Sequence, residues 1–184
     1  MSTLIVYFSL DGNTKFISEK ISETINADII SLKTRKKYPT EGFKKYFWGG
    51  KSVILGDKPK LSNEHVDLNF YETIIIGTPV WSGTFAPPIK TFLSQYKIEN
   101  KRVALFACHG AGQAEKCFRK IKEAIPKNEF VGEIDFVEPN RHPEESASKA
   151  VKWAESLAIW LEFVYRLKYR FIKYACCIDI RHVL

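Results

Sequence analysis

Short apolar runs alternate with helical stretches along most of this chain, and this alternation restricts its fold more than any other feature. Runs rich in β-branched and aromatic residues predict five strands, at residues 3–8, 28–32, 73–79, 102–108 and 131–137. Apolar residues at helical spacing predict four helices, at residues 13–25, 87–96, 114–125 and 143–164. Strands that are apolar throughout and separated by helices are typical of a parallel sheet covered on both faces. The sequence therefore predicts an α/β fold.

The loop after the first strand, SLDGNT at residues 9–14, has the character of an anion site. Such a loop meets the free backbone N–H groups and the positive dipole end of the following helix. Ser9 and Thr14 add hydroxyl donors, and Gly12 lets a ligand approach the backbone. These residues favour a phosphate, and the lack of a lysine in the loop favours a retained phosphate ester. A well-formed helix cap is the alternative interpretation.

Two further strand ends carry unusual loops, TPVWSGTFAPP at residues 78–88 and CHGAG at 108–112. Trp81 could stack on a planar ring, or it could be a partly buried tryptophan that covers the sheet edge. The glycines of the other loop could bring backbone N–H groups to the polar rim of the same ring, or form a plain turn. Because ligands of parallel sheets bind beyond the carboxyl ends of the strands, the three loops together predict a flavin mononucleotide (FMN) site.

Other nucleotide, metal and nucleic-acid sites are not indicated. The dinucleotide fingerprint G-x-G-x-x-G is absent, and GGKS at residues 49–52 lacks the earlier glycine and leading strand of a P-loop. The four cysteines form no C-x-x-C pair, which argues against a metal centre. The net charge of +7 is concentrated at residues 33–60 (+7) and 164–184 (+4), so the remainder is acidic at −4. A nucleic-acid binder more often spreads basic residues over one face.

The three loops resemble those of the flavodoxins. The resemblance implies a three-layer sandwich with a five-stranded parallel sheet of order 2-1-3-4-5, non-covalent FMN, and electron transfer without a substrate or catalytic residues of its own. It implies that the phosphate is bound by Ser9, Leu10, Asp11, Gly12, Asn13 and Thr14. It places one side of the ring against Thr78, Pro79, Val80, Trp81, Ser82 and Gly83. It places the pyrimidine edge near Cys108, His109 and Gly110. It also implies that the Ser82–Gly83 peptide turns to accept a hydrogen bond from the reduced flavin.

Three features depart from the flavodoxin pattern. Asp11 stands where a hydroxyl residue is frequent, so we expect its carboxylate to point away from the phosphate or to cap the helix. His109 could be protonated and favour negative charge on reduced flavin, or it could be a solvent-facing histidine. The chain is basic whereas flavodoxins are usually acidic, so its redox partner proteins, acidic ones among them, would differ from the usual ones.

The expected domain spans residues 1–163 and includes a basic, aromatic insert at about residues 33–70. The insert is interpreted either as a flap over the sheet edge or as a lid beside the flavin. The basic extension at 164–184 is read as a helix extension, a membrane-surface segment or sequence foreign to the family. The chain shows no signal-peptide pattern and no apolar run of the roughly 18 residues that a spanning helix needs, so we expect a cytoplasmic protein.

Two functions from different classes fit these features. The first is an electron carrier that holds FMN and exchanges electrons with redox partners. The second is an NAD(P)H-dependent quinone or FMN reductase, for which the basic insert would attract a phosphorylated nicotinamide cofactor. A flavin-binding regulatory module is a weaker third interpretation. The scattered histidines form no acid–base pair in the sequence, which favours the carrier.

Overall fold

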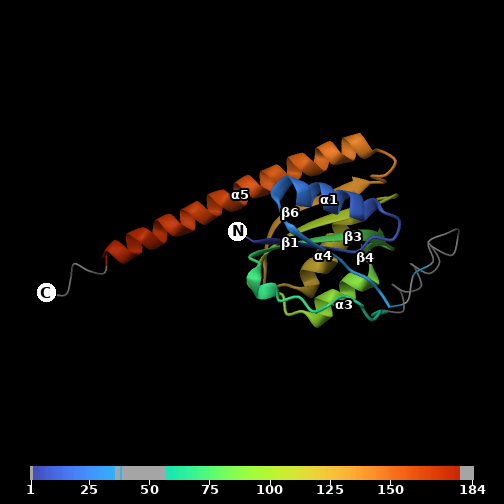
Figure 1. Cartoon of the computed structure of the whole chain (residues 1–184), viewed down its shortest axis with the longest axis horizontal. Coiled ribbons are helices and arrows are strands. Elements are labelled where there is room, and N and C mark those ends of the chain that lie inside the picture. Colours follow the sequence, from blue (N-terminus) through green and yellow to red (C-terminus); the bar gives the residue numbers. More distant parts are fainter. Residues whose placement is uncertain (1, 36–37, 39–56, 179–184) are drawn as a thin grey trace.

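Five long parallel strands form the centre of the protein, seen in the computed structural model of Figure 1, which describes residues 2–35, 38 and 57–178. These strands are β1 (Thr3–Tyr7), β2 (Asp28–Ser31), β3 (Thr73–Trp81), β5 (Arg102–His109) and β6 (Glu129–Val137). The order across the sheet is β2-β1-β3-β5-β6. Numbered along the chain, the long strands therefore follow the predicted order 2-1-3-4-5.

A sixth strand, β4 (Thr84–Phe85), pairs antiparallel with the end of β3 and was not predicted. Val80 lies opposite Phe85 and Trp81 opposite Thr84. The predicted count of five strands was therefore one too low, although the α/β class is confirmed. The prediction failed because β4 has only two residues and lies inside a stretch that reads as a loop.

Helices cover both faces of the sheet, as expected. The helices α1 (Asn13–Ile25) and α5 (Pro143–Ile178) lie on one face, and α3 (Pro87–Gln95) and α4 (Ala114–Ala124) lie on the other. A short 3-10 helix, η1 (Leu68–Phe70), precedes β3. The chain leaves the sheet between β2 and η1, and most of the insert, at residues 36–37 and 39–56, lies outside the described residues.

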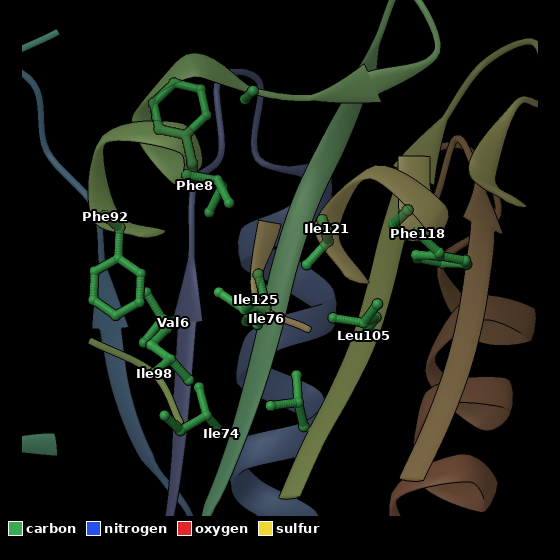
Figure 2. Packing of buried hydrophobic residues seen from close by; sticks show 14 of the residues in the cluster. Val6, Phe8, Ile74, Ile76, Phe92, Ile98, Leu105, Phe118, Ile121 and Ile125 are labelled. Carbon is green, nitrogen blue, oxygen red and sulfur yellow. The ribbon is translucent and has the colours of Figure 1, made fainter. Parts of the chain in front are cut away.

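Alternate residues of each strand fill two separate hydrophobic cores, because successive side chains of a strand point to opposite faces. Val6, Ile74 and Leu105 pack with Phe92 of α3 and Ile121 of α4, as Figure 2 shows. Ile5, Ile75 and Phe106 pack with α1 and α5 on the other face. This double burial explains why the strands read as continuous apolar runs.

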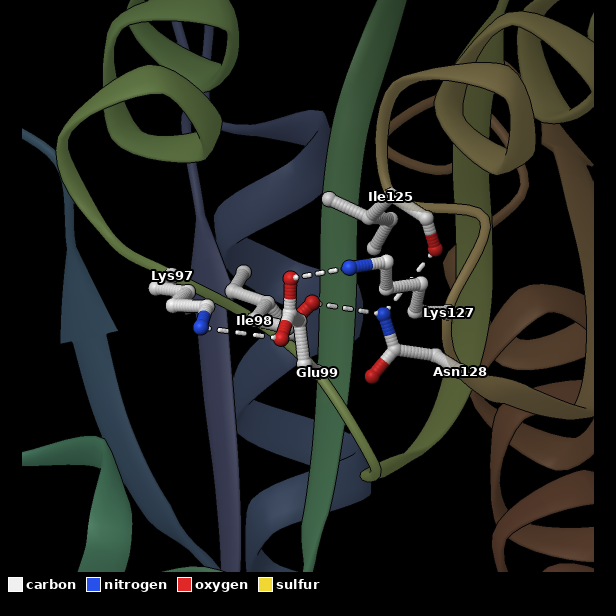
Figure 3. A network of polar contacts seen from close by, with 6 residues as sticks. All are labelled: Lys97, Ile98, Glu99, Ile125, Lys127 and Asn128. Atoms are coloured by element: carbon white, nitrogen blue, oxygen red, sulfur yellow. Dashed lines mark hydrogen bonds and ion pairs between the residues drawn. The ribbon is translucent and has the colours of Figure 1, made fainter.

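The amino ends of β5 and β6 are tied together by a polar network (Figure 3). Glu99 pairs with Lys97 at 3.1 Å and with Lys127 at 3.2 Å, and these hydrogen bonds lower the pKa of its carboxyl. Asn128 Nδ2 donates to the carbonyl oxygens of Ile98 and Ile125 at 2.8 and 2.9 Å. The network lies at the end of the sheet opposite to the three predicted binding loops.

The last helix, α5, extends well beyond the sheet (Figure 1). Leu161 is the last buried residue of α5 among those whose side chains the structure describes, and Ile159 and Phe163 are 70% and 59% exposed. The helix continues through Ile178, in keeping with the helix-extension interpretation of the tail, and residues 179–184 lie outside the described residues. Within the described part of the chain, none of the helices combines the length and apolarity that crossing a membrane requires.

Candidate functional site

The three predicted loops meet at one edge of the sheet. β1, β3 and β5 are adjacent and parallel, so their carboxyl ends and the loops that follow lie side by side. These loops are residues 8–12, the turn between β3 and β4, and residues 110–113. The edge has the position that ligands occupy in parallel α/β sheets.

Two buried hydroxyls at the first loop have no hydrogen-bond partner. Thr14, in the first turn of α1, is fully buried, and its Oγ1 and the Oγ of Ser9 are both unsatisfied among the described residues. Leaving such a group unpaired costs about 1–3 kcal/mol. Gly12, the residue before α1, has a φ of 90°, and no side chain among the described residues caps the helix, so the helix-cap interpretation is not supported. Two hydroxyls without a partner in the described structure, beside the backbone N–H groups of the first turn of a helix, fit a phosphate group.

A second loop holds the first one in place. Asn140, in the connection between β6 and α5, donates from its backbone N to Asn13 Oδ1 at 2.9 Å. Its side-chain Nδ2 donates to the Asp11 carbonyl oxygen at 3.2 Å. The Asn13 side-chain oxygen therefore has a partner within the protein, and the predicted contact of Asn13 with a ligand stays a prediction. Asp11 is exposed, which agrees with an outward-pointing carboxylate.

The second predicted loop is a tight hairpin. Ser82 and Gly83 connect β3 to β4 with φ values of 50° and 69°, the two positive angles of a type I′ turn. A Cβ at Gly83 would overlap Gln113 Oε1, so the hairpin tip touches the start of α4. Thr78 Oγ1 accepts from Ala86 N and donates to the Pro79 carbonyl, both at 3.0 Å. The Thr78 side chain thus braces the hairpin, and its predicted ligand contact would have to come from its backbone.

Trp81 belongs to a cluster of three aromatic rings. Its ring centroid lies 5.9 Å from that of Phe8 and 5.5 Å from that of Tyr38, both in edge-to-face geometry. Trp81 is half-buried, as the sheet-edge interpretation requires, and its predicted stacking role stays a prediction. Burial, with the nearby charge of Asp57 as a smaller cause, raises the pKa of Tyr38 to about 12. Tyr38 is thus an insert residue that reaches the site.

The Cys108 side chain is buried on the face of the sheet that α1 and α5 cover. Cys108 is 3% exposed, and burial raises the pKa of its thiol to about 12. The Thr14 hydroxyl is near enough to lower this pKa slightly, although the two groups do not reach hydrogen-bond geometry. The predicted contact of Cys108 with a ligand stays a prediction.

His109 does not face the solvent, so the solvent-facing interpretation of its side chain was wrong, while its predicted effect on reduced flavin stays a prediction. The side chain is 7% exposed, and its Nε2 lies 2.9 Å from Asp135 Oδ2. Gly112 N donates to Nδ1 at 2.9 Å. Both ring nitrogens are therefore occupied within the protein. Leu10, Pro79, Val80 and Gly110 lie in or beside these loops, and their predicted contacts stay predictions.

Several residues that shape the site were missed in the sequence analysis: Phe8, Tyr38, Gln113, Asp135 and Asn140. Each contacts a residue that is distant in the sequence, as Asn140 contacts Asn13 at a sequence separation of 127. Only the apolar run that contains Phe8 and the aromatic character of the insert gave a local signal.

The fold and the loops together define an α/β protein in which three strand-end loops lie side by side at the head of the first helix. The family model described as flavodoxin matches residues 2–138, and the chain belongs to that family.

Among solved structures, the chain is similar to a flavoprotein in complex with FMN from Lactobacillus acidophilus. The two are 29% identical with a TM-score of 0.66, over 83% of this chain and 98% of that one. A flavoprotein from Bacteroides eggerthii is 19% identical, with a TM-score of 0.67 and coverages of 89% and 98%. A Fusobacterium nucleatum flavodoxin bound to FMN is 12% identical, with a TM-score of 0.53 and coverages of 86% and 98%. No curated protein matches the chain.

Proposed function

We propose that this protein binds FMN non-covalently and carries electrons between redox partner proteins. The observation that carries the proposal is the pair of buried hydroxyls, Ser9 Oγ and Thr14 Oγ1, that lack partners at the start of α1 in the described structure. An FMN phosphate would accept hydrogen bonds from both hydroxyls and from backbone N–H groups of the helix. The similarity to the Lactobacillus flavoprotein in complex with FMN supports this choice of ligand.

The other two loops supply groups for the ring of the cofactor. The hairpin, residues 78–83, offers the Trp81 ring and the Ser82–Gly83 backbone, and the chain at residues 108–110 would lie at the other edge of the ring. When bound, FMN supplies redox chemistry at its isoalloxazine ring. The chain itself contributes binding, orientation and a partly apolar environment through Phe8, Tyr38 and Trp81.

A carrier needs no side chain that donates a proton to a substrate, and the site agrees with this. His109, the histidine expected at the site, is engaged at both nitrogens by Asp135 and Gly112. The basic residues of the insert suit acidic partner proteins through electrostatic steering. The same charge is the feature that favours the second candidate, an NAD(P)H-dependent reductase of quinones or FMN.

The cofactor assignment is tested by the absorption spectrum of the purified protein and by binding to the apoprotein. We expect a yellow protein that releases FMN on denaturation, and an apoprotein that binds FMN much more tightly than riboflavin. A colourless protein whose apo form takes up neither compound would overturn the assignment.

Carrier and reductase are separated by anaerobic reduction. We expect dithionite, and not NADH or NADPH alone, to bleach the bound flavin rapidly, and the reduced protein to pass electrons to an acidic electron-transfer protein. Rapid bleaching by either nicotinamide, followed by turnover with a quinone, would replace the carrier with the reductase. A matched control is free FMN at the same concentration.

A further inference from the structure

His109 and Asp135 come from neighbouring strands at the site edge. His109 is the last residue of β5, and Asp135 lies on β6 opposite Ala107, two positions earlier on β5. Because side chains two residues apart share a face of a sheet, the two groups meet on the same side. The distance from His109 Nε2 to Asp135 Oδ2 is 2.9 Å. This pairing links the strand that carries the third loop to the adjacent edge strand.

The hydrogen bonds fix where the ring carries its proton. A backbone N–H can only donate, so His109 Nδ1 must accept from Gly112 and must be unprotonated. The proton of the neutral ring is therefore on Nε2, where it is donated to the Asp135 carboxylate. An acceptor at Asp135 stabilises the tautomer that can hold Gly112.

The contact continues from Gly112 into the hairpin. Gly112 and Gln113 have φ values of 88° and 68°, so two successive left-handed residues form the turn that begins α4. Such conformations persist only where the surrounding structure supports them. The Gln113 side chain then covers Gly83 at the hairpin tip. One ring thus braces the turn that contacts the second predicted flavin loop.

The charged residues near His109 and Asp135 make contacts of their own. Lys149 of α5 donates from Nζ to the Asp135 carbonyl oxygen at 2.7 Å, and its Nζ lies 5.3 Å from the Phe136 ring centroid. Glu138, which follows β6, approaches Gly110 and pairs with Arg141 at 2.8 Å. Asp11 and Asp135 both act on the Cys108 thiol. Lys149 contacts the backbone of Asp135, so the carboxylate remains available to His109.

We propose that Asp135 is a positioning residue for flavin binding, acting through His109 on the turn at residues 110–113 and, through Gln113, on the hairpin tip. The effect on flavin rests on the proposed function, whereas the effect on the loops does not. Asp135 keeps His109 in the tautomer that accepts from Gly112, and the ring holds two loops in the arrangement that receives the cofactor. Prearranged loops bind with less loss of conformational entropy.

The variants Asp135→Leu and Asp135→Asn separate positioning from charge. Both remove the negative charge, but the asparagine side-chain oxygen can still accept from Nε2–H. Simple removal of a carboxylate would favour binding of the anionic FMN in both variants. Loss of positioning would weaken binding only in Asp135→Leu. Glu129→Gln, an exposed position at the other end of β6, is the matched control for loss of a charge.

The first measurement uses the apoprotein and needs no flavin. Nitrogen-15 NMR of His109 should show the Nε2–H tautomer in the wild type, Asp135→Asn and Glu129→Gln. Hydrogen exchange at the Gly112 amide should be at least about tenfold faster in Asp135→Leu, as expected for loss of one hydrogen-bonded brace. An Nδ1–H tautomer or a charged ring in the wild type would overturn the proposal without any variant. Unchanged exchange in Asp135→Leu would do the same.

The second measurement is the FMN dissociation constant. We expect about a tenfold increase in Asp135→Leu, with wild-type values in Asp135→Asn and Glu129→Gln. Equal affinity in Asp135→Leu and the wild type would overturn the role in flavin binding. A wild type that binds no FMN would overturn the proposed function instead, and the apoprotein measurements would still decide whether Asp135 positions the loops.

Discussion

At the scale of single residues, the Thr14 hydroxyl has opposite effects on the stability of the apoprotein and on the proposed binding of a phosphate. Its hydroxyl is buried without a partner among the described groups, so it lowers the stability of the apoprotein. The same hydroxyl is available to a phosphate at the start of α1. A residue that lowers stability but serves binding is expected at a functional site.

Thr14→Val tests these opposite effects. We expect the free energy of unfolding of the apoprotein to stay equal or rise by about 1 kcal/mol, since an unsatisfied polar group is replaced by a methyl group. FMN binding should weaken about 10- to 100-fold, the loss of a hydrogen bond to a charged group, while riboflavin binding changes little. Urea unfolding and fluorescence titration measure the two effects. Thr14→Ser, which keeps the hydroxyl, is the control, and equal losses for FMN and riboflavin would refute the phosphate assignment.

The two buried thiols predict a loss of stability at alkaline pH. Burial raises the pKa of Cys108 and Cys117 from the ordinary value of 9.0 to about 12. Between these values the unfolded chain releases protons that the folded protein keeps. The stabilising contribution is therefore complete below pH 9 and is lost as the pH rises toward 12, by about 1.4 kcal/mol per pH unit for each thiol.

Urea unfolding at pH 8 and pH 10 measures this effect. The wild type should lose more stability between the two pH values than the double variant Cys108→Ala/Cys117→Ala. Comparison with the double variant removes the contribution of tyrosines and lysines, which also titrate in this range. Equal losses in the two proteins would contradict the prediction.

At the scale of secondary-structure elements, contact between β3 and β5 depends on a residue without a side chain. Gly77 of β3 lies beside Phe106 of β5, and a Cβ at Gly77 would overlap the Phe106 ring. The Phe106 ring therefore occupies the space that a side chain at position 77 would need. The pair of β3 and β5 also carries the hairpin and the third loop of the site.

Gly77→Ala should destabilise the protein by about 1–3 kcal/mol through overpacking of the core. Gly132→Ala on β6 is the matched control, because its Cβ would lie 3.5 Å from the Trp153 ring, an ordinary contact distance. We expect the control to change stability by less than about 0.5 kcal/mol. Denaturant unfolding of the two variants gives the comparison, and similar values for both would contradict this account of the central strands.

At the scale of the whole molecule, α5 continues past the last of its side chains that the structure describes as buried. Leu157 and Leu161 of α5 are 4% exposed, whereas Ile159, Trp160 and Phe163 are 70%, 37% and 59% exposed. The domain boundary expected at residue 163 thus falls just after the last buried side chain that the structure describes. Membrane-surface contact by the basic segment beyond it stays a prediction.

A chain that ends at residue 163 should fold and bind FMN like the full chain. We expect its melting temperature to differ by less than about 4 °C, which corresponds to a change of roughly 1 kcal/mol or less. Leu157→Ala, which removes buried side-chain volume from α5, should instead cost about 2–5 kcal/mol. Calorimetry of the three proteins tests the boundary, and an unfolded truncated chain would place the boundary further along α5.

The residue patterns by themselves determined the α/β class and the loops at the strand ends, whereas the order of the long strands was implied by the resemblance to the flavodoxins. The patterns could do so because burial on both faces makes each strand an apolar run, and because helix starts and turns use local residue preferences. Ser9, Gly12 and Thr14 could be singled out for the same reason, since they lie within one loop, and their phosphate contacts stay predictions.

Only the tertiary structure decided which side chains remain available at that edge. His109 could not be interpreted correctly because its partner Asp135 lies 26 residues away on another strand. The structure also shows that Asn13 Oδ1 accepts from Asn140 and that Thr78 Oγ1 accepts from Ala86, which no local pattern indicated. The strand β4 could not be predicted because two residues are too few to show an alternation of apolar and polar side chains. Hydrogen bonds between distant segments depend on how strands are placed side by side, and no local pattern records that placement.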